Sequence, residues 1–366
     1  MDQGKTHQDV SRNFPGIRAK PWIVVVGGFL GAGKTTLILA AAKELESRGL
    51  RSAVILNDQG EALVDTDLAE RNGMRSGEVT GGCFCCRFSD LMSVMGDLRK
   101  YSPDVIFAEP VGSCTDISAT TLRPLLEYSD AYRIAPYTVL IDPARAEALL
   151  KQDAEADMSF LFKKQLEEAD LVCFTKADVH SELPELPATP VRQLSAKTGT
   201  GVAAWLDEVL SGVLTAGSEV LDIDYEQYAR AEAALAWLNL QVTLRPPEPL
   251  SAAMVLGPFL DRLDTAFTAN DIQIVHLKAI ASSSQGYVKA AICGNGQIPV
   301  IEGTLDSSPA LALDLLLNLR AVGAEEEVGR IVEQELHGMK YREENLRISC
   351  FHPAAPVPER RIPALS

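Results

Sequence analysis

Residues 22–39 read WIVVVGGFLGAGKTTLIL, an apolar run that breaks into a glycine-rich turn before a second apolar stretch. This order predicts a strand, a phosphate-binding loop and a helix. The spacing from Gly28 to Gly33, Lys34 and Thr35 is the complete G-x-x-x-x-G-K-[ST] pattern. Glycines let successive backbone N–H groups converge on phosphate oxygens, and the helix directs its positive N-terminus at the same anion. The stretch therefore predicts a nucleoside triphosphate site, with a structural glycine turn as the alternative.

Each polar side chain of this loop has an expected role. Lys34 would reach the β- and γ-phosphates, and Thr35 would supply a hydroxyl to Mg²⁺. Backbone amides of the same turn would surround the β-phosphate. The expected nucleotide-binding residues of the loop are Gly28, Gly31, Ala32, Gly33, Lys34, Thr35 and Thr36.

Length and charge limit the class of protein. A chain of 366 residues is long for a single hydrophobic core, so we expect two domains. The net charge of −16 argues against nucleic acid as a partner, because binding a phosphate backbone needs a basic face. The first 20 residues are polar without an apolar signal core, and no window reaches transmembrane length. We therefore expect a cytoplasmic protein with no membrane partner.

Short apolar runs alternate with helical stretches through the first half of the chain. The predicted strands after the first are residues 53–56, 104–109, 138–141, 171–174 and 191–194. This alternation predicts an α/β fold: a mostly parallel sheet with helices on both faces and ligands at the carboxyl ends of the strands. At one such end, Glu109 is the candidate to hold Mg²⁺ through water or to orient the attacking water. The segment from Gly60 to about Gly82 is expected to be a long polar loop.

Two further polar motifs follow predicted strands and suit a guanine base. Thr175-Lys176-Ala177-Asp178 supplies a carboxylate that can accept two hydrogens from the guanine edge, which adenine cannot offer. Lys176 would lie along the ring, and the backbone near Ala196, in Ser195-Ala196-Lys197, would contact the exocyclic oxygen. The alternative is a solvated turn between a strand and a helix.

Three of the seven cysteines are packed into Cys83-Phe84-Cys85-Cys86, directly after two glycines. Thiolates bind soft or borderline ions such as Zn²⁺, and a glycine bend brings three sulfurs within reach of one ion. Three ligands leave a coordination position open, which suits an ion that must be released. A fixed structural zinc and a redox or inert thiol cluster are the alternatives. Cys114 either completes the shell or is a small buried residue.

The chain resembles the CobW/HypB/UreG group of P-loop GTPases, and its CobW-like metal-handling branch in particular. The resemblance covers residues 21–212. It rests on GGFLGAGKTT (27–36), NDQG (57–60), GGCFCC (81–86), Glu109-x-x-Gly112, QLEEADLVCFTKAD (165–178) and Ser195-Ala196-Lys197. It implies GTP hydrolysis coupled to the delivery of a transition metal (Zn²⁺, Co²⁺ or Ni²⁺), or to the maintenance of a metal cofactor, for a client metalloprotein.

Residue roles follow from matching the motifs one by one. The resemblance implies that Lys34, Glu109 and Asp58 act in catalysis, and that Cys83, Cys85 and Cys86 hold the transition metal. It extends the nucleotide-binding set with Gly112, Thr175, Lys176, Asp178, Ser195, Ala196 and Lys197. Two motifs depart from the usual family pattern. The loop Asn-Glu-Phe-Gly is here Asn57-Asp58-Gln59-Gly60, and the Asn of the base motif is Thr175.

The motifs end near residue 212, and a second module is predicted beyond them. We expect an N-terminal arm (1–20), a GTPase domain (21–215), a connecting helix (216–236), a C-terminal α+β domain (237–345) and a proline-rich extended tail (346–366). Within the second domain we expect a helix at 251–266, strands at 272–279, 286–293 and 298–301, and a long helix at 309–336, with the helices on one face.

A second function of a different class stays open on the sequence. In that hypothesis the chain is a nucleotide-gated regulatory protein with a structural zinc at the cysteines. The sequence does not identify the metal ion, the client or the oligomeric state, a homodimer included.

Overall fold

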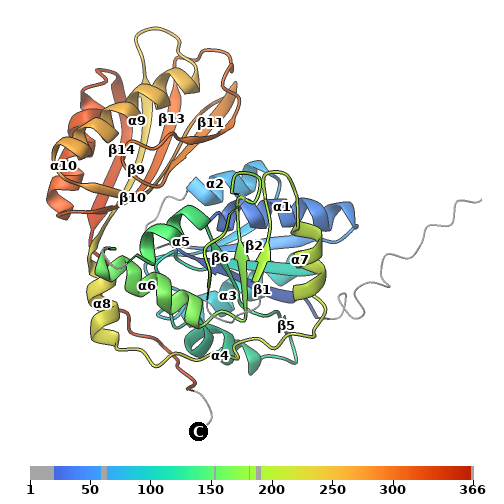
Figure 1. Cartoon of the computed structure of the whole chain (residues 1–366). Coiled ribbons are helices and arrows are strands. Elements are labelled where there is room, and N and C mark those ends of the chain that lie inside the picture. The colour runs from blue at the N-terminus through green and yellow to red at the C-terminus, as the bar shows by residue number, and fades with distance from the viewer. Residues whose placement is uncertain (1–19, 59–63, 152–153, 181, 187–190, 364–366) are drawn as a thin grey trace, which may run out of the picture.

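A computed structural model describes residues 20–58, 64–151, 154–180, 182–186 and 191–363 of the chain (Figure 1). The expected N-terminal arm therefore lies outside the described residues, apart from Lys20. Gln59 and Gly60 of the Asn57-Asp58-Gln59-Gly60 loop lie outside them as well.

The first part of the chain forms a parallel sheet with the strand order β3-β2-β4-β1-β6-β7-β8, in which β5 pairs with β1. The strands are β1 (Trp22–Gly28), β2 (Ser52–Asn57), β3 (Arg75–Val79), β4 (Val105–Glu109), β5 (Arg133–Ile134), β6 (Thr138–Ile141), β7 (Leu171–Phe174) and β8 (Val191–Gln193). The helical elements are α1 (Lys34–Ser47), α2 (Val64–Arg71), α3 (Phe88–Leu98), η2 (Arg99–Tyr101), η3 (Ser118–Leu122), α4 (Arg123–Leu126), α5 (Pro143–Leu149), α6 (Ala156–Glu167) and α7 (Val202–Val209). The predicted parallel α/β sheet is confirmed.

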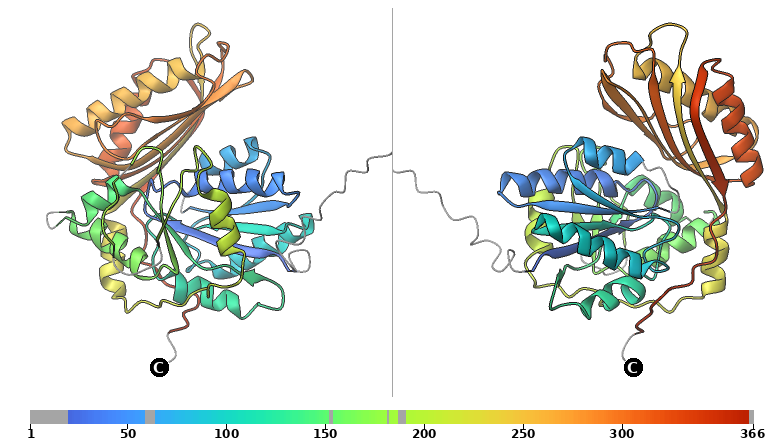
Figure 2. Two further views of the ribbon diagram at one scale, coloured as in Figure 1. Left: turned by 45° about the vertical axis from the view of Figure 1, so that its right-hand side comes forward. Right: turned by 180° about the vertical axis from the view of Figure 1, so that it is seen from behind.

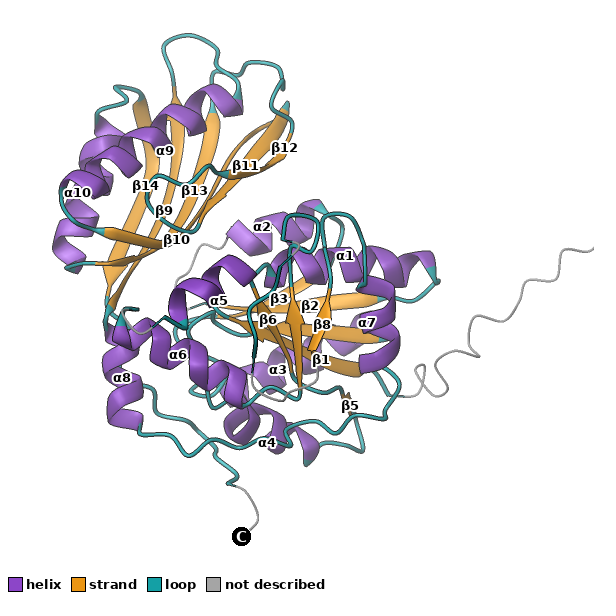
Figure 3. Ribbon diagram, in the orientation of Figure 1, coloured by secondary structure: helices purple, strands orange, loops and turns teal. Residues whose placement is uncertain are grey.

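Helices cover both faces of this sheet (Figure 3). Successive side chains of a strand point to opposite faces, so alternate residues of β1 enter different cores. Ile23 packs in a core with residues of α3 and α6. Val24 packs in another core with residues of α1 and α7. Burial on both faces explains why β1 reads as a continuous apolar run rather than an alternating one.

The second half of the chain forms an antiparallel sheet in the order β12-β11-β10-β13-β9-β14. The chain reaches it through α8 (Tyr225–Ala233). Its strands are β9 (Leu235–Arg245), β10 (Gln273–Ser283), β11 (Gly286–Ile292), β12 (Val300–Gly303), β13 (Leu313–Val322) and β14 (Arg342–Phe351), and its helices are α9 (Ala252–Ala269) and α10 (Glu325–His337). We infer that the two sheets mark two domains, which lie side by side in all views (Figure 2).

The two faces of the second sheet differ in character. Alternate residues of β10 and β13, such as Leu277 and Leu317, form an apolar core with α9 and α10. This confirms the expected helices on one face. The residues between them, including Lys278 and Arg320, point the other way and make contacts with the first domain. No helix within the described ranges is long and apolar enough to cross a membrane.

Three expectations about secondary structure are wrong. The described part of the expected loop at 60–82 contains α2 and β3, where β3 completes the parallel edge of the sheet beside β2. The expected helix at 309–336 is instead strand β13 followed by α10, with the break at Gly323. The sheet also extends past both expected ends of the second domain: β9 begins inside the expected connecting helix, and β14 occupies the first residues of the expected tail.

The core of the first domain contains an acidic side chain, Glu168. It is fully buried directly after α6. Its carboxylate oxygens accept hydrogen bonds from the Thr115 hydroxyl (3.1 Å) and from the Ser118 backbone N–H (3.1 Å). Burial raises the pKa of Glu168 to about 8, because the interior disfavours the charged form.

This buried acid predicts a pH-dependent stability. Between about pH 4.5 and the folded pKa, the folded state retains a proton that the unfolded state has lost, so stability falls as pH rises and levels off above that pKa. In Glu168→Gln this contribution disappears. Relative to the variant, the wild type should lose up to about 1.4 kcal/mol of unfolding free energy per pH unit across this range. Urea unfolding of both proteins from pH 5 to 9 measures the difference, and parallel profiles would contradict the prediction.

Candidate nucleotide and metal site

The predicted phosphate loop joins β1 to α1 at the carboxyl edge of the parallel sheet. Gly33 is the residue before α1 and adopts a left-handed conformation (φ +91°), which suits a residue without Cβ. Gly33 has no side chain that could accept hydrogen bonds from the first amides of α1, so these N–H groups remain free to bind an anion in the loop. Lys34 curls back over the turn, and its ammonium donates to the Gly28 carbonyl at 3.0 Å. The seven loop residues singled out in the sequence therefore lie in one continuous segment, from the last residue of β1 to the first turn of α1.

Residues at and just after the end of β4 also surround the Lys34 side chain. Burial lowers the pKa of its ammonium, while the nearby carboxylate of Glu109 raises it. A Cβ at Gly112 would stand 2.7 Å from Leu30 Cδ2 and 3.0 Å from Lys34 Nζ. A larger residue at Gly112 would therefore displace the side chains of Leu30 and Lys34. The structure brings Gly112 next to the phosphate loop, as its inclusion in the predicted nucleotide set requires.

Three oxygen-bearing side chains meet beside the loop. The Thr35 hydroxyl lies 3.0 Å from Asp65 Oδ1 and 3.1 Å from Glu109 Oε1. The second oxygen of Glu109, Oε2, is buried with no hydrogen-bond partner among the described residues. Burial raises the pKa of Glu109, and the Asp65 carboxylate raises it further. Carboxylate and hydroxyl oxygens suit Mg²⁺, which takes one or two carboxylates together with substrate phosphates. The residues present therefore fit the ion.

The base motif lies at the ends of β7 and β8, next to the same loop. The Thr175 hydroxyl is within hydrogen-bond distance of the Ala32 carbonyl (2.9 Å) and the Ile141 carbonyl (3.1 Å). Threonine therefore ties this motif to the phosphate loop at the position where the family pattern has Asn. Ser195 donates to Asp178 at 2.6 Å, and this hydrogen bond lowers the pKa of the Asp178 carboxyl.

Lys176, Ala196 and Lys197, the remaining residues of the two base motifs, lie beside Asp142 or in a neighbouring cleft. Lys176 has a left-handed backbone (φ +57°), and its ammonium lies 2.5 Å from Asp142 Oδ2. Ala196 and Lys197 line a cleft of about 500 Å³ together with Thr36 of the phosphate loop. This volume falls within the range of small-molecule sites, roughly 300–1,000 Å³. The cleft therefore lies between α1 and the Ser195-Ala196-Lys197 segment.

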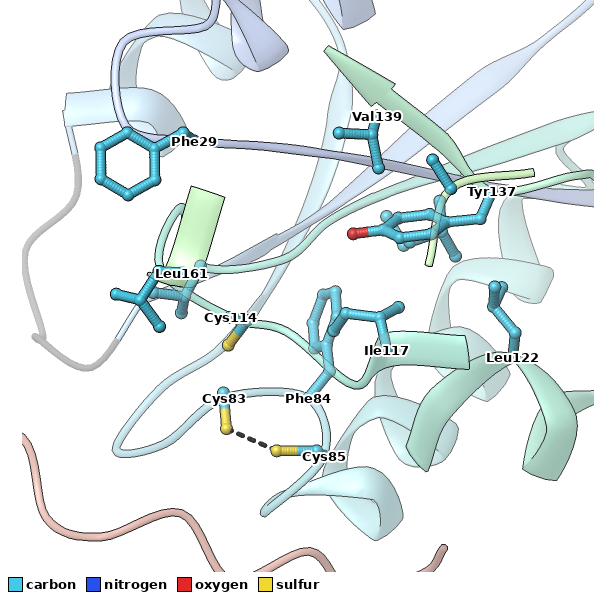
Figure 4. Close-up of a cluster of buried hydrophobic side chains, with 14 of the residues drawn as sticks. Phe29, Cys83, Phe84, Cys85, Cys114, Ile117, Leu122, Tyr137, Val139 and Leu161 are labelled. Atoms are coloured by element: carbon cyan, nitrogen blue, oxygen red, sulfur yellow. Dashed lines mark hydrogen bonds between the residues drawn. The ribbon is translucent and has the colours of Figure 1, made fainter. Parts of the chain in front are cut away.

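The cysteines of the turn before α3 form a compact sulfur cluster (Figure 4). Sγ of Cys83 lies 2.7 Å from Sγ of Cys85 and 3.4 Å from Sγ of Cys86. The three sulfurs lie within 4.8 Å of one another, so they could hold one metal ion. Cys83 and Cys85 are buried, whereas Cys86 is partly exposed. The predicted metal-binding residues are therefore brought together.

Cys114 directs its sulfur toward the same turn (Figure 4). Hydrogen bonds from the thiols of Cys114, Cys85 and Cys86 hold the pKa of Cys83 well below its usual range. The hydrogen bond with Cys83 favours the protonated form of Cys86 and raises the pKa of Cys86 to about 11. The neighbouring S–H groups thus favour the deprotonated form of Cys83. A metal ion would replace those protons.

Asn57 connects the cysteine turn to the nucleotide edge of the sheet. Its amide nitrogen donates to the Val79 carbonyl (2.9 Å) and the Gly82 carbonyl (2.7 Å), and its amide oxygen accepts from the Phe84 N–H (2.9 Å). Asn57 is the last residue of β2 and directly precedes Asp58. A shift at the end of β2 would therefore move the backbone on both sides of Cys83.

A family model described as the CobW/HypB/UreG nucleotide-binding domain matches residues 22–198. The match spans the phosphate loop, the cysteine turn and the base motif. Residues 22–198 are a CobW/HypB/UreG nucleotide-binding domain. The expected resemblance is confirmed over this part of the chain.

Curated relatives of this CobW/HypB/UreG domain are named for zinc and GTP. The zinc chaperone CobW of Pseudomonas aeruginosa is 30% identical over 188 residues, which are 44% of this chain and 50% of that protein. The zinc chaperone YjiA of Escherichia coli is 28% identical over 170 residues, 45% of this chain and 52% of that protein. The zinc-regulated GTPase metalloprotein activator 1 of Schizosaccharomyces pombe is 28% identical over 218 residues, 55% of this chain and 49% of that protein. The chain spans about half the length of these relatives.

The second sheet contributes side chains to the CobW/HypB/UreG domain that no motif indicated. Lys278 of β10 donates to both oxygens of Asp65, at 2.8 and 2.6 Å. Arg320 of β13 donates to both oxygens of Asp58, at 2.7 and 2.6 Å. Asp58 is thus held in an ion pair with the second domain, and its expected role in catalysis stays a prediction. Alternation along β10 and β13 could have placed Lys278 and Arg320 on a polar face, but not against these carboxylates.

The end of the chain covers the cysteine turn of the CobW/HypB/UreG domain. After β14, residues 352–363 contain no helix or strand, as expected for the proline-rich tail. The Glu359 N–H donates to the Cys85 carbonyl at 2.9 Å, and the Val357 N–H donates to Cys86 Sγ at 3.2 Å. The Glu359 carboxylate accepts from the Ser89 hydroxyl at 2.6 Å. The tail therefore connects the second domain to the sulfur cluster.

Proposed function

We propose that this chain hydrolyses GTP and uses the nucleotide state to bind and release a transition metal ion, Zn²⁺ first, for a client metalloprotein. The observation that supports this most directly is the set of hydrogen bonds from Asn57, which tie the end of β2 to both sides of Cys83. The names of the relatives, which include zinc chaperones and a GTPase metalloprotein activator, support the choice of zinc and GTP.

In this proposal each residue near the phosphates has one task. Lys34 and the amides of the loop neutralise and orient the phosphates. Thr35, Asp65 and Glu109 would hold Mg²⁺, which supplies positive charge to the phosphate oxygens. Glu109 could also orient the attacking water molecule, since its Oε2 has no hydrogen-bond partner among the described residues.

The specificity for guanine would come from Asp178. Its two carboxylate oxygens can accept two hydrogens from the guanine edge. The Ser195 hydroxyl fixes the orientation of this carboxylate from one side. The tie between Thr175 and Ala32 keeps the base motif at a constant distance from the phosphate loop.

Two short paths would transmit the nucleotide state to the metal. One passes from Asp58 to its neighbour Asn57 and through hydrogen bonds to the turn. The other runs along the chain from Glu109, beside the phosphates, through Gly112 to Cys114, beside Cys83. Loops at the edge of a parallel sheet are a common place for such switching.

The alternative is a regulatory protein with a structural zinc. It is favoured by the approach of Cys114 to the cluster, because four thiolates form a closed tetrahedral site that does not need to exchange its ion. The two functions differ in whether metal affinity depends on the nucleotide, since coupling between two ligands must be reciprocal.

Metal affinity in two nucleotide states tests the proposal. We expect the affinity for Zn²⁺ and Co²⁺ to differ by about tenfold or more between the protein with a non-hydrolysable GTP analogue and the protein with GDP. Asn57→Ala should bring the two affinities close together. Asn270→Ala, which removes only a local hydrogen bond at the end of α9, should leave the difference intact. Equal affinities in the wild type would overturn the proposal in favour of a structural zinc.

A further inference from the structure

The polar face of the second sheet lies directly against the phosphate loop. Lys278 of β10 and Lys289 of β11 line, together with Gly33, Lys34 and Thr35, a single pocket of about 90 Å³. The two domains approach closely here, since a Cβ at Gly31 would lie only 2.4 Å from Sγ of Cys293. The second domain therefore forms one wall of the phosphate site.

Lys278 occupies the central position in this wall. Its ammonium is 3.4 Å from the Thr35 hydroxyl and within 2.8 Å of both oxygens of Asp65. The side chain is 17% exposed. Thr35 also contacts Glu109, so the ammonium stands at the group of residues expected to surround the terminal phosphates.

The motifs of the first domain leave out one of the cations that phosphate sites of this kind commonly use, and Lys278 could supply it. P-loop NTPases stabilise the charge of the transferred phosphoryl group with Lys, a metal ion and a further cation supplied in cis or in trans. The first domain supplies Lys34, but its motifs contain no obvious arginine for the third role. Lys278 comes from the other domain and reaches the site beside Thr35 and Asp65.

We propose that Lys278 contacts the γ-phosphate of bound GTP across the domain interface and acts as a catalytic cation of the hydrolysis. This inference rests on the proposed GTPase activity. The Lys278 ammonium lies 3.4 Å from the Thr35 hydroxyl, so a γ-phosphate bound beside Thr35 would compete with Asp65 for it. GDP lacks the γ-phosphate, so Lys278 returns to Asp65 after hydrolysis and release of phosphate.

The proposal also explains how the second domain would respond to the nucleotide. A pocket of about 90 Å³ is far smaller than a typical ligand site of roughly 300–1,000 Å³, so the sheet has to shift to admit the phosphates and then settle with Lys278 against them. A contact with the γ-phosphate then favours one position of the second domain in the GTP form only. Since the chain continues from this domain to the tail on the cysteine turn, the same movement reaches the sulfur cluster.

Nucleotide affinity and turnover of Lys278→Met and Lys278→Arg test this inference. Lys278→Met should lower kcat for GTP about 100-fold, in line with the loss of one preorganised charge-stabilising group. It should also reduce the preference for a non-hydrolysable GTP analogue over GDP about tenfold or more, with GDP affinity unchanged. Lys278→Arg retains the charge and should recover much of both effects.

Arg320→Met serves as the matched comparison, because it breaks the other ion pair between the domains, to Asp58. It should change the affinities for GTP analogue and GDP together. If Lys278→Met behaved in the same way, or left kcat unchanged, Lys278 would only hold the domains together and the inference would be overturned. A wild-type protein that neither binds nor hydrolyses GTP would instead overturn the proposed function, and the inference with it.

Discussion

Cys83→Ala is expected to lower the affinity of the protein for Zn²⁺ by about 100-fold or more. Structural zinc sites in small peptides are worth roughly 10–16 kcal/mol over four ligands, so one ligand contributes about 3 kcal/mol. Cys83 is the sulfur nearest to both other cysteines of the turn. Hydrogen bonds from its neighbours also lower the pKa of Cys83, so this thiol loses its proton to a metal ion more readily than the others. Competition with a chromogenic chelator measures the affinity.

Cys350→Ala is the control for this result. Cys350 is a free cysteine in β14, outside the group of thiols that could hold a metal. Its replacement should leave the Zn²⁺ affinity unchanged. Cys114→Ala in the same assay separates the two possible coordination shells: a loss close to that of Cys83→Ala indicates four thiolate ligands, and no loss indicates three. A Cys83→Ala protein that kept the wild-type affinity would show that the metal site lies elsewhere.

Lys34→Met is expected to weaken the binding of GTP by about 100-fold and to reduce its hydrolysis at least as much. Methionine has a similar length but no charge and no donor. The ammonium lies in the turn, 3.0 Å from the Gly28 carbonyl, and is buried, so its charge acts on the phosphates with little screening by water. A fluorescent GTP analogue measures binding, and phosphate release measures turnover.

Lys100→Met is the control for charge alone. Lys100 pairs with Asp97 on the surface, where its side chain is 75% exposed. Its loss should leave both quantities within about twofold of the wild type, since surface pairs contribute little. Unchanged GTP binding in Lys34→Met would mean that the glycine-rich loop is a structural turn, the alternative that the sequence leaves open.

Elements with a strong local pattern were predictable from the sequence. Residues 22–39 combine a buried strand, a left-handed glycine turn and a helix, and all three occur as expected. The same holds for the cysteine turn, whose glycines directly precede Cys83 and which leads into α3. Each of these two sites is built from residues that are adjacent in the sequence, so both could be identified without knowledge of tertiary contacts.

The misassigned segments have ambiguous or weak local patterns. In β13, the odd positions from Leu313 to Ala321 enter the core with α9 and α10. Leu316 stands at an even position as well, so residues 315–317 form a continuous run of leucines, which is equally compatible with a helix. Strand β3 is short and largely polar, so only its pairing with β2 makes it a strand.

The amino-acid sequence by itself determined the phosphate loop, the base motif and the group of three cysteines, because each is built from residues close together in the chain. Only the tertiary structure decided which groups meet at these sites. Lys278 and Asp65 are 213 residues apart, and Val357 and Cys86 are 271 apart. Such pairs depend on how two sheets and an extended tail pack together, and local patterns of hydrophobicity carry no information about that packing.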